Sequence, residues 1–299
     1  MARMVFLGTP DAAADPLRTL VDAGHDIALV VSRPDKRRGR RGGLTPSPVK
    51  MVATELGLEV TDLLEDVLGV DAEMGVVVAY GRIIPVAVLD RVPMVNLHFS
   101  LLPRWRGAAP VERAILEGDA ETGVCLMAVE AGLDTGGIYA EASTVIGTGE
   151  TADHLRSRLV AMGCDLLREH LAEGFAGLPR ARDQIGTPSY AEKLLPGERE
   201  LRWDRPANHI NRVIRVGRAW TTFRGRRVGL QRATEVTAPI SGGERIGGSE
   251  PGSLVGCDVV AGGGTWLRLV SVRPEGKQSM DAEDWIRGVR PEPGERLGS

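Results

Sequence analysis

The sequence predicts an α/β domain with a Rossmann-like, mostly parallel sheet and helices on both faces, followed by a small OB-like β barrel. Residues 3–7 and 27–31 are apolar runs on either side of a segment with helical spacing, which is a strand-helix-strand pattern. The uninterrupted run 75–80 indicates a strand buried on both faces, as in parallel sheets. Beyond residue 205, short apolar runs alternate with Gly, Ser and Pro, which is typical of a small barrel.

Other elements follow from periodicity and turn residues. Helices are expected over 11–23, 48–56, 83–90, 111–116, 151–172 and 210–217, and short helical turns over 62–71. Further strands are expected over 94–98, 123–130, 137–143, 227–230, 253–255 and 266–270. The turn after the first strand lacks the glycine fingerprint of dinucleotide-binding proteins, so NAD is not expected.

Length and composition indicate a two-domain globular protein. The 299 residues are 42% hydrophobic and 26% charged, and no apolar run approaches the roughly 20 residues that a membrane-spanning helix needs. The three cysteines are widely spaced without metal-ligand spacing, so we expect a cytoplasmic protein and no metal. The first domain is expected over 1–188, a linker over 189–204 and the barrel over 205–299.

Charge is distributed unevenly along the chain. Residues 205–299 carry 15 Lys and Arg against 10 Asp and Glu, whereas the rest carries 22 against 30. Within the first 204 residues, the segment 33–44 contains six basic side chains and three glycines and has almost no apolar content, which predicts an exposed, mobile loop. Such basic regions suit a polyanionic partner, although an unevenly charged, merely solvated surface would give the same pattern.

Three polar residues suggest chemistry. Asn96 and His98 are two apart in a predicted strand and should point to the same face, while Asp134 lies in the glycine-rich loop 131–137. An amide that donates to an oxyanion, an imidazole that accepts a proton and a carboxylate that orients the imidazole or relays its proton would suffice for acyl transfer to an amine. Viewed separately, Asn96 is equally well a turn residue and His98 an ordinary buried histidine.

The stretch from Asn96 to Pro110, which reads NLHFSLLPRWRGAAP, resembles a signature of the 10-formyltetrahydrofolate-dependent formyltransferases. Residues 133–136 (LDTG) resemble a second signature, and segments 5–10, 44–50, 77–81, 190–194 and 276–280 are similar to other parts of these enzymes. The resemblance extends over nearly the whole chain and implies the formyltransferase fold.

The resemblance implies that Asn96, His98 and Asp134 are the catalytic residues and that 10-formyltetrahydrofolate is the formyl donor. The residues expected to line the folate pocket are Ala79, Tyr80, Gly81, Ile83, Ser100, Leu101, Leu102, Pro103, Gly132, Leu133, Thr135 and Gly136. It also implies methionyl initiator tRNA as acceptor and a monomer, with tRNA contacts from Arg37, Arg38, Arg40, Arg41, Lys193, Arg215 and Arg218. Two other functions remain open: formylation of a sugar-nucleotide amine, and RNA binding without catalysis.

Phe99 and residues 62–71 are among the places where the chain departs from the family pattern, as are Gly42-Gly43 and the region around Trp220. Phe99 stands where a small residue is usual, and it either narrows the site or packs in the core. Residues 62–71 are shorter than the corresponding segment of the family, which implies that one edge of the first domain is trimmed.

Overall fold

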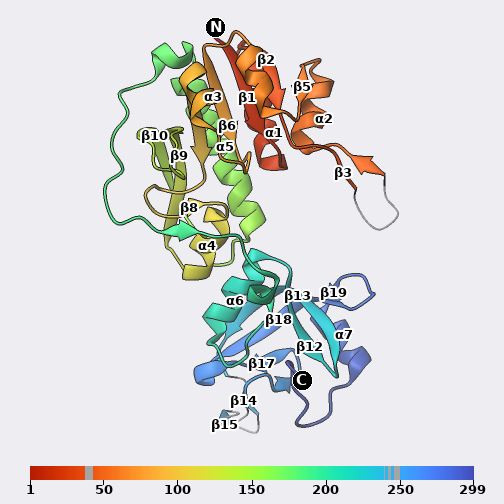
Figure 1. Cartoon of the computed structure of the whole chain (residues 1–299). Coiled ribbons are helices and arrows are strands. Elements are labelled where there is room, and N and C mark those ends of the chain that lie inside the picture. Colours follow the sequence, from red (N-terminus) through yellow and green to blue (C-terminus); the bar gives the residue numbers. More distant parts are fainter. Residues whose placement is uncertain (38–42, 239, 242–243, 246–249) are drawn as a thin grey trace. The chain divides into compact units, whose positions relative to one another are not determined.

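The structure is a computed structural model that describes residues 1–37, 43–238, 240–241, 244–245 and 250–299. The chain divides into two compact units (Figure 1). Unit 1 comprises Met1–Arg113, Ala120–Ile146 and His154–Glu192, and unit 2 comprises Ala114–Asp119, Gly147–Asp153 and Lys193–Ser299. Each unit is described by itself below.

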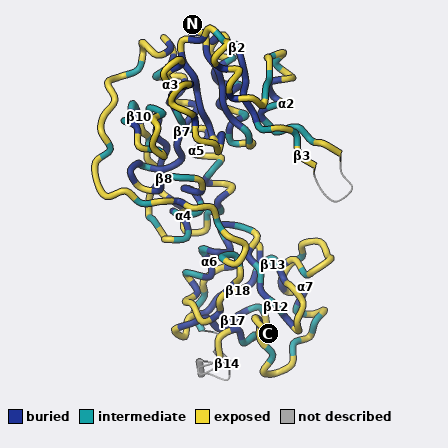
Figure 2. Tube along the Cα trace, in the orientation of Figure 1, coloured by how far each residue is buried: buried dark blue, intermediate teal, exposed yellow. Residues whose placement is uncertain are grey.

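Unit 1 is organised around a seven-stranded sheet in the order β10-β9-β7-β6-β1-β2-β5. The strands are β1 (Arg3–Gly8), β2 (Asp26–Val31), β5 (Val60–Thr61), β6 (Met74–Val78), β7 (Met94–His98), β9 (Glu121–Ala128) and β10 (Ile138–Val145). Strands β5, β2, β1, β6 and β7 pair in parallel, and β9 and β10 extend the sheet in antiparallel fashion. Figure 2 shows that buried residues are concentrated along these strands, as expected of a sheet covered on both faces.

Helical segments cover both faces of this sheet. On one face, η2 (Leu64–Gly69) and α3 (Val86–Arg91) bury Leu64, Val67 and Val88 against side chains of β1, β2 and β6. On the other face, Gly163 of α5 (Ala152–His170) lies against Leu97 and Val124. The other helical segments that begin in unit 1 are η1 (Asp11–Ala13), α1 (Ala14–Asp22), α2 (Pro48–Glu55), α4 (Pro110–Glu117) and η3 (Gly174–Gly177).

Two short strand pairs in unit 1 were not predicted. Strands β3 (Lys36–Arg37) and β4 (Leu44–Thr45) pair on either side of residues 38–42, so the ends of the predicted basic loop are ordered. The expectation of mobility for residues 38–42 itself lies outside the described residues. Strands β8 (Arg106–Gly107) and β11 (Tyr190–Ala191) pair in parallel, which attaches a segment of the predicted linker to the loop that follows β7.

Unit 2 contains an antiparallel sheet in the order β12-β13-β18-β17-β16, with β19 paired to β18. Its elements are η4 (Pro196–Arg199), α6 (Ala207–Val216), β12 (Ala219–Phe223), β13 (Arg226–Val236), β14 (Ile240–Ser241), β15 (Glu244–Arg245), β16 (Leu254–Val255), β17 (Asp258–Val260), η5 (Gly262–Gly264), β18 (Trp266–Pro274), β19 (Met280–Asp281) and α7 (Ala282–Val289). Helices α6 and α7 contribute Ile210 and Trp285 to its core. Leu201 and Trp203, from the predicted linker, also belong to this core.

The predicted α/β domain with helices on both faces and the predicted small β domain are both confirmed. Within the described part of unit 2, β12 and β16 are the edges of the main sheet and do not pair with each other, and β14 and β15 form a separate pair. Helix α7 was missed, although Trp285 and Ala282 bury one face of it.

A salt bridge across two strands of unit 2 offers a test of this packing. Asp258 of β17 lies opposite Arg268 of β18 and accepts hydrogen bonds from its Nε and one Nη, at 2.7 and 2.8 Å. The carboxylate side chain is only 7% exposed, whereas the arginine side chain is 56% exposed. Removal of the guanidinium therefore leaves a buried charge without its partner.

We expect R268M to lower the free energy of unfolding of unit 2 by about 2 kcal/mol. This is less than the roughly 3–5 kcal/mol for wholly buried pairs, because water reaches the arginine side of the bridge. Urea unfolding of the full chain, followed by tryptophan fluorescence, measures the loss. The matched control is R287M, which removes an exposed ion pair with Asp284 on α7 and should change stability by less than about 0.5 kcal/mol. Equal small losses in both variants would contradict the assigned burial of Asp258.

Candidate active site

The candidate site lies where β7 ends. Asn96 and His98 occupy alternate positions on this strand, opposite Met127 and Cys125 of β9, so all four side chains lie on one face. Cys125 and Met127 form a small apolar cluster with Leu102 and Ile138 at this face. The Asn96 amide is half-buried and has no hydrogen-bond partner among the described residues, so its N–H groups are available to a ligand.

The imidazole of His98 is oriented by a backbone carbonyl. The ring is buried, and its Nε2 lies 2.8 Å from the carbonyl oxygen of Trp105. A carbonyl oxygen can only accept a hydrogen bond, so Nε2 is the donor and carries a proton. In the neutral ring the other nitrogen, Nδ1, is then the one with a free lone pair.

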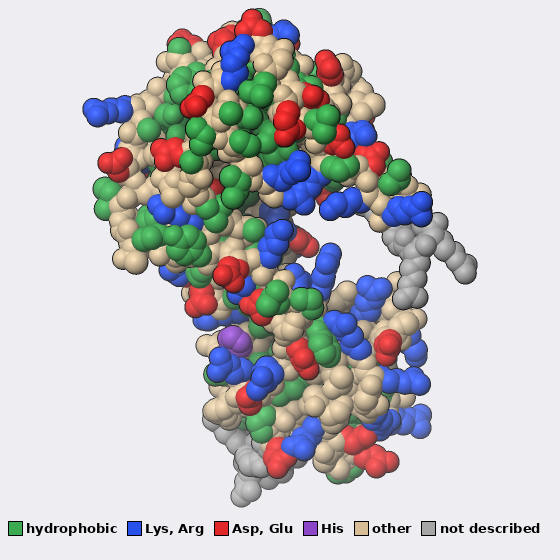
Figure 3. All heavy atoms as spheres, in the orientation of Figure 1, with side chains coloured by type: hydrophobic (Ala, Val, Ile, Leu, Met, Phe, Trp, Pro, Cys, Tyr) green, Lys and Arg blue, Asp and Glu red, His purple; other side chains and the backbone are tan. Residues whose placement is uncertain are grey.

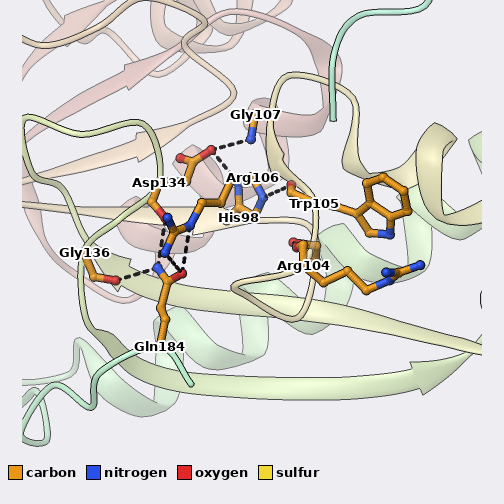
Figure 4. A network of polar contacts seen from close by, with 9 residues as sticks. His98, Arg104, Trp105, Arg106, Gly107, Asp134, Gly136 and Gln184 are labelled. Carbon is orange, nitrogen blue, oxygen red and sulfur yellow. Dashed lines mark hydrogen bonds and ion pairs between the residues drawn. The ribbon is translucent and has the colours of Figure 1, made fainter. Parts of the chain in front are cut away.

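Asp134 lies next to this free nitrogen. Its Oδ2 is 3.5 Å from His98 Nδ1 and accepts a hydrogen bond of 2.7 Å from the backbone N–H of Gly107 (Figure 4). The carboxylate side chain is 15% exposed, so water screens it only partly. The end of β7 and the loop after β9 thus bring together His98 and Asp134, and Asn96 lies on the same face of β7 as His98.

The site contains several residues with left-handed backbone conformations. Ala79, Trp105 and Asp134 have φ values of +46°, +63° and +51°, a region that residues other than glycine seldom adopt. Such conformations are often found at functional sites, where surrounding contacts hold them in place. Here the Trp105 N–H donates to Ser189 Oγ at 3.0 Å, and the Asp134 carbonyl accepts from Gln184 Nε2 at 2.8 Å.

Sequence reasoning missed the groups that support the trio. Trp105 and Gly107 act through their main-chain carbonyl and N–H, which every residue type can supply and which therefore leave no signal in the sequence. Ser189 begins the predicted linker 189–204, and Gln184 lies in the part of the predicted first domain that follows α5, where no site residue was expected. Their polar side chains gave no indication that they reach back to the loops at 105 and 134.

The predicted folate-lining residues differ in exposure. Ile83 and Leu133 are 74% and 53% exposed, so their apolar side chains are accessible to a ligand. Tyr80 is 2% exposed, and its hydroxyl has no hydrogen-bond partner within the described parts of the chain. Ala79, Gly81, Gly132 and Thr135 are exposed, Leu101 is half-buried, and Ser100, Leu102, Pro103 and Gly136 are buried. Tyr80 is therefore the member of this set that offers a ligand little accessible surface.

Two buried side chains, Cys125 and Phe99, lie next to the residues of the site. Burial raises the pKa of the Cys125 thiol to about 12, so this thiol, opposite His98 on β9, stays neutral and is a poor nucleophile. Phe99 is 8% exposed, which agrees with packing in the core. Cys125 is therefore not a candidate for a covalent enzyme intermediate.

The predicted tRNA contacts lie in several places. Arg37 is exposed on β3, Lys193 and Arg218 are exposed in unit 2, and Arg38, Arg40 and Arg41 lie outside the described residues. Basic side chains are prominent on the face of unit 2 seen in Figure 3. Arg215 differs from the others, because its guanidinium donates to the carbonyls of Glu150 and Gly147 at 2.7 and 2.8 Å. Burial lowers the pKa of Arg215 from its ordinary value, as expected of an anchored side chain.

Within the described parts of the chain, no group of three or more His, Cys, Asp and Glu side chains is arranged to hold a metal ion. Of the helices in those same ranges, none combines the length and the apolar character needed to cross a membrane.

Comparison with known proteins gives matches over both units. Residues 2–171 match the family model described as formyl transferase, and residues 193–290 match the model of the formyl transferase C-terminal domain. The methionyl-tRNA formyltransferase of Roseobacter denitrificans is 41% identical over 312 residues, which cover 98% of this chain and 97% of that protein. The methionyl-tRNA formyltransferase of Methylobacterium nodulans is 39% identical over 315 residues, which cover 99% of each.

Solved structures show the same fold. An N-formyltransferase from Helicobacter canadensis, in complex with folinic acid and dTDP-3-aminofucose, has a TM-score of 0.68 and 16% identity. The similarity covers 90% of this chain and 99% of that one, and at this identity it supports the fold alone. The family models and the relatives near 40% identity show, beyond the fold, which family the chain belongs to. The chain belongs to the formyl transferase family.

Proposed function

We propose that this protein transfers the formyl group of 10-formyltetrahydrofolate to the free amino group of methionyl initiator tRNA, in the cytoplasm. The observation that carries the proposal is the similarity to methionyl-tRNA formyltransferases, which spans 98–99% of the chain and so includes unit 2 as well as the site in unit 1. The folinic acid named for the Helicobacter canadensis enzyme is a formylated folate, which supports a folate donor.

The geometry of the trio fits attack by an amine on the formyl carbon. The amine nitrogen forms a bond to that carbon, and the formyl oxygen becomes an oxyanion. The unpaired Asn96 amide is the group that would donate to this oxygen. The bond between the formyl carbon and N10 of the folate then breaks, and N10 receives the proton that the amine gives up.

His98 is the group that would move this proton. His98 Nε2 donates its proton in a hydrogen bond to the Trp105 carbonyl. Nδ1 is therefore the ring nitrogen that can accept a further proton. When Nδ1 is protonated, the ring acquires a positive charge 3.5 Å from the Asp134 carboxylate. The attraction between these opposite charges stabilises the ring while it holds the proton.

The direct test uses purified protein, 10-formyltetrahydrofolate and three acceptors: methionyl initiator tRNA, methionyl elongator tRNA and a nucleotide-linked amino sugar. We expect formyl-methionyl-tRNA from the initiator tRNA as the main product. Formylation of the sugar amine in its place would identify a sugar formyltransferase. Binding of tRNA without turnover of any acceptor would identify a non-catalytic RNA-binding homologue.

Substitution of His98 tests proton transfer. We expect H98A to lower the rate of formyl transfer by about 10²–10⁴, because a positioned acid–base group typically contributes that much. Single-turnover assays with saturating initiator tRNA measure the chemical step. The control is H170A, in the last turn of α5, which should leave the rate unchanged. A loss of less than about threefold in H98A would exclude a role in proton transfer.

Salt dependence tests the predicted tRNA contacts. Each arginine that meets a phosphate should contribute about one unit to the slope of log affinity against log salt. We therefore expect R218A and R40A to give shallower slopes than the wild-type protein. By contrast, R215A should leave the slope unchanged and lower the melting temperature, because Arg215 is occupied by two carbonyl groups. The control is R168A, which removes an exposed ion pair on α5. Unaltered slopes in both R218A and R40A would show that neither Arg218 nor Arg40 contacts tRNA phosphates.

A further inference from the structure

We propose that Gln184 is a positioning residue that holds Asp134 beside His98. The inference rests on the proposed function, because the position of Asp134 matters to the reaction only if the trio performs formyl transfer. Gln184 lies in the segment between the bridge at Arg182 and strand β11, far in the sequence from both loops of the site. Its side chain binds no side chain of the trio and instead binds the main chain of one member, Asp134.

The side-chain amide of Gln184 links two loops. Its Nε2 donates to the carbonyl oxygens of Asp134 and Gly136, both at 2.8 Å (Figure 4). Its Oε1 accepts from Nε and one Nη of Arg106, at 3.0 and 2.6 Å. An amide side chain has two N–H donors and two acceptor lone pairs, so these four bonds use its full capacity.

The bonds to Asp134 and Gly136 fall where the main chain most needs support. Asp134 has a left-handed conformation, with a φ of +51°, in a loop without regular secondary structure. A Cβ atom at Gly136 would lie 2.1 Å from the carbonyl oxygen of Ala128. The main chain of the Asp134 loop therefore packs closely against the end of β9 at this position. Gln184 therefore fixes the main chain at the residue that carries the carboxylate and again two residues later.

The other end of the bridge fixes the partner of that carboxylate. Arg106 directly precedes Gly107, whose N–H donates to Asp134 Oδ2 at 2.7 Å. The Arg106 N–H donates to the Ser189 carbonyl at 2.9 Å, within the β8–β11 pairing. By binding Arg106 and the Asp134 loop at once, Gln184 sets the spacing between the carboxylate and the N–H that orients it.

Two substitutions separate the two halves of this bridge. Q184M has a similar length and forms neither set of bonds. Q184E can still accept from Arg106, but it lacks the N–H donors and places carboxylate oxygens against two carbonyl oxygens. If support of Asp134 is the function of Gln184, both variants should be impaired. If the function is only to hold Arg106, Q184E should resemble the wild-type protein.

We expect kcat for formylation of methionyl initiator tRNA to fall about 10–100-fold in both variants, since a misplacement of about 1 Å can cost 10²-fold. The KM for tRNA should change by less than about threefold, because the bridge supports chemistry and not tRNA binding. The control is Q278M, an exposed position in unit 2, which should match the wild-type protein. Wild-type kcat in either Q184M or Q184E would overturn the proposal.

A double-mutant cycle shows whether Gln184 acts through Asp134. In the D134N background, adding Q184M should slow the reaction by less than about threefold, because the group that Gln184 positions is already lost. If the two losses multiply, Gln184 acts independently of Asp134 and the proposal is wrong. Melting temperatures of each variant identify a loss due to unfolding, and Q184E, which keeps the Arg106 contact, is the variant to use if Q184M is unstable.

A crystal structure of Q184E gives a readout that needs no activity. We expect Asp134 Oδ2 to leave hydrogen-bonding distance of the Gly107 N–H, while the wild-type protein keeps this contact. An unchanged Asp134 in Q184E would overturn the positioning role. If the wild-type protein formylates none of the acceptors, the proposed function fails, and the crystal structure still decides whether Gln184 holds Asp134.

Discussion

The candidate site depends on two main-chain groups in one short segment. The Trp105 carbonyl accepts a hydrogen bond from His98 Nε2, and the Gly107 N–H donates to Asp134 Oδ2. The two groups are two residues apart, so a single piece of backbone orients both the imidazole and the carboxylate. This segment is held by pairing with β11, and the Ala191 carbonyl accepts from the N–H groups of Ala108 and Ala109 at 2.8 and 3.1 Å. The position of the candidate pair His98 and Asp134 therefore depends on β11, a strand distant in the sequence.

This arrangement gives the two ring nitrogens of His98 different partners: Nε2 faces the Trp105 carbonyl and Nδ1 faces Asp134. A fixed proton on Nε2 leaves Nδ1 basic, and Nδ1 is the nitrogen that faces Asp134. A proton on Nδ1 would place a positive charge 3.5 Å from the Asp134 carboxylate, and both side chains are largely buried. The apolar cluster of Leu102, Cys125, Met127 and Ile138 lies on the same face, and burial keeps its one thiol neutral.

Much of the fold, and the placement of Asn96 and His98 on one face of β7, could be predicted because side-chain period carries that information. The alternation on β7 placed Asn96 and His98 on one face, and the glycine-rich loop drew attention to Asp134. The supports were not predictable in this way, because main-chain donors and acceptors are the same in every residue and Gln184 meets the site through tertiary contacts alone.

Tyr80 illustrates another limit: the run 75–80 predicted a strand, but the strand ends at Val78, and Ala79 has a left-handed conformation before the buried Tyr80. Helix α7 was missed although Ala282, Trp285, Ile286 and Val289 are at helical spacing, because the segment is only eight residues long and directly follows a short strand.

The measurement that tests the central claim most directly is ¹⁵N-edited NMR of the His98 ring in uniformly labelled protein, assigned by comparison with H98A. The hydrogen bond to the Trp105 carbonyl predicts that the neutral ring carries its proton on Nε2 and has an unprotonated Nδ1. A ring with its proton on Nδ1 and a bare Nε2 would contradict the orientation of His98 by the Trp105 carbonyl, and with it the proton path through Nδ1.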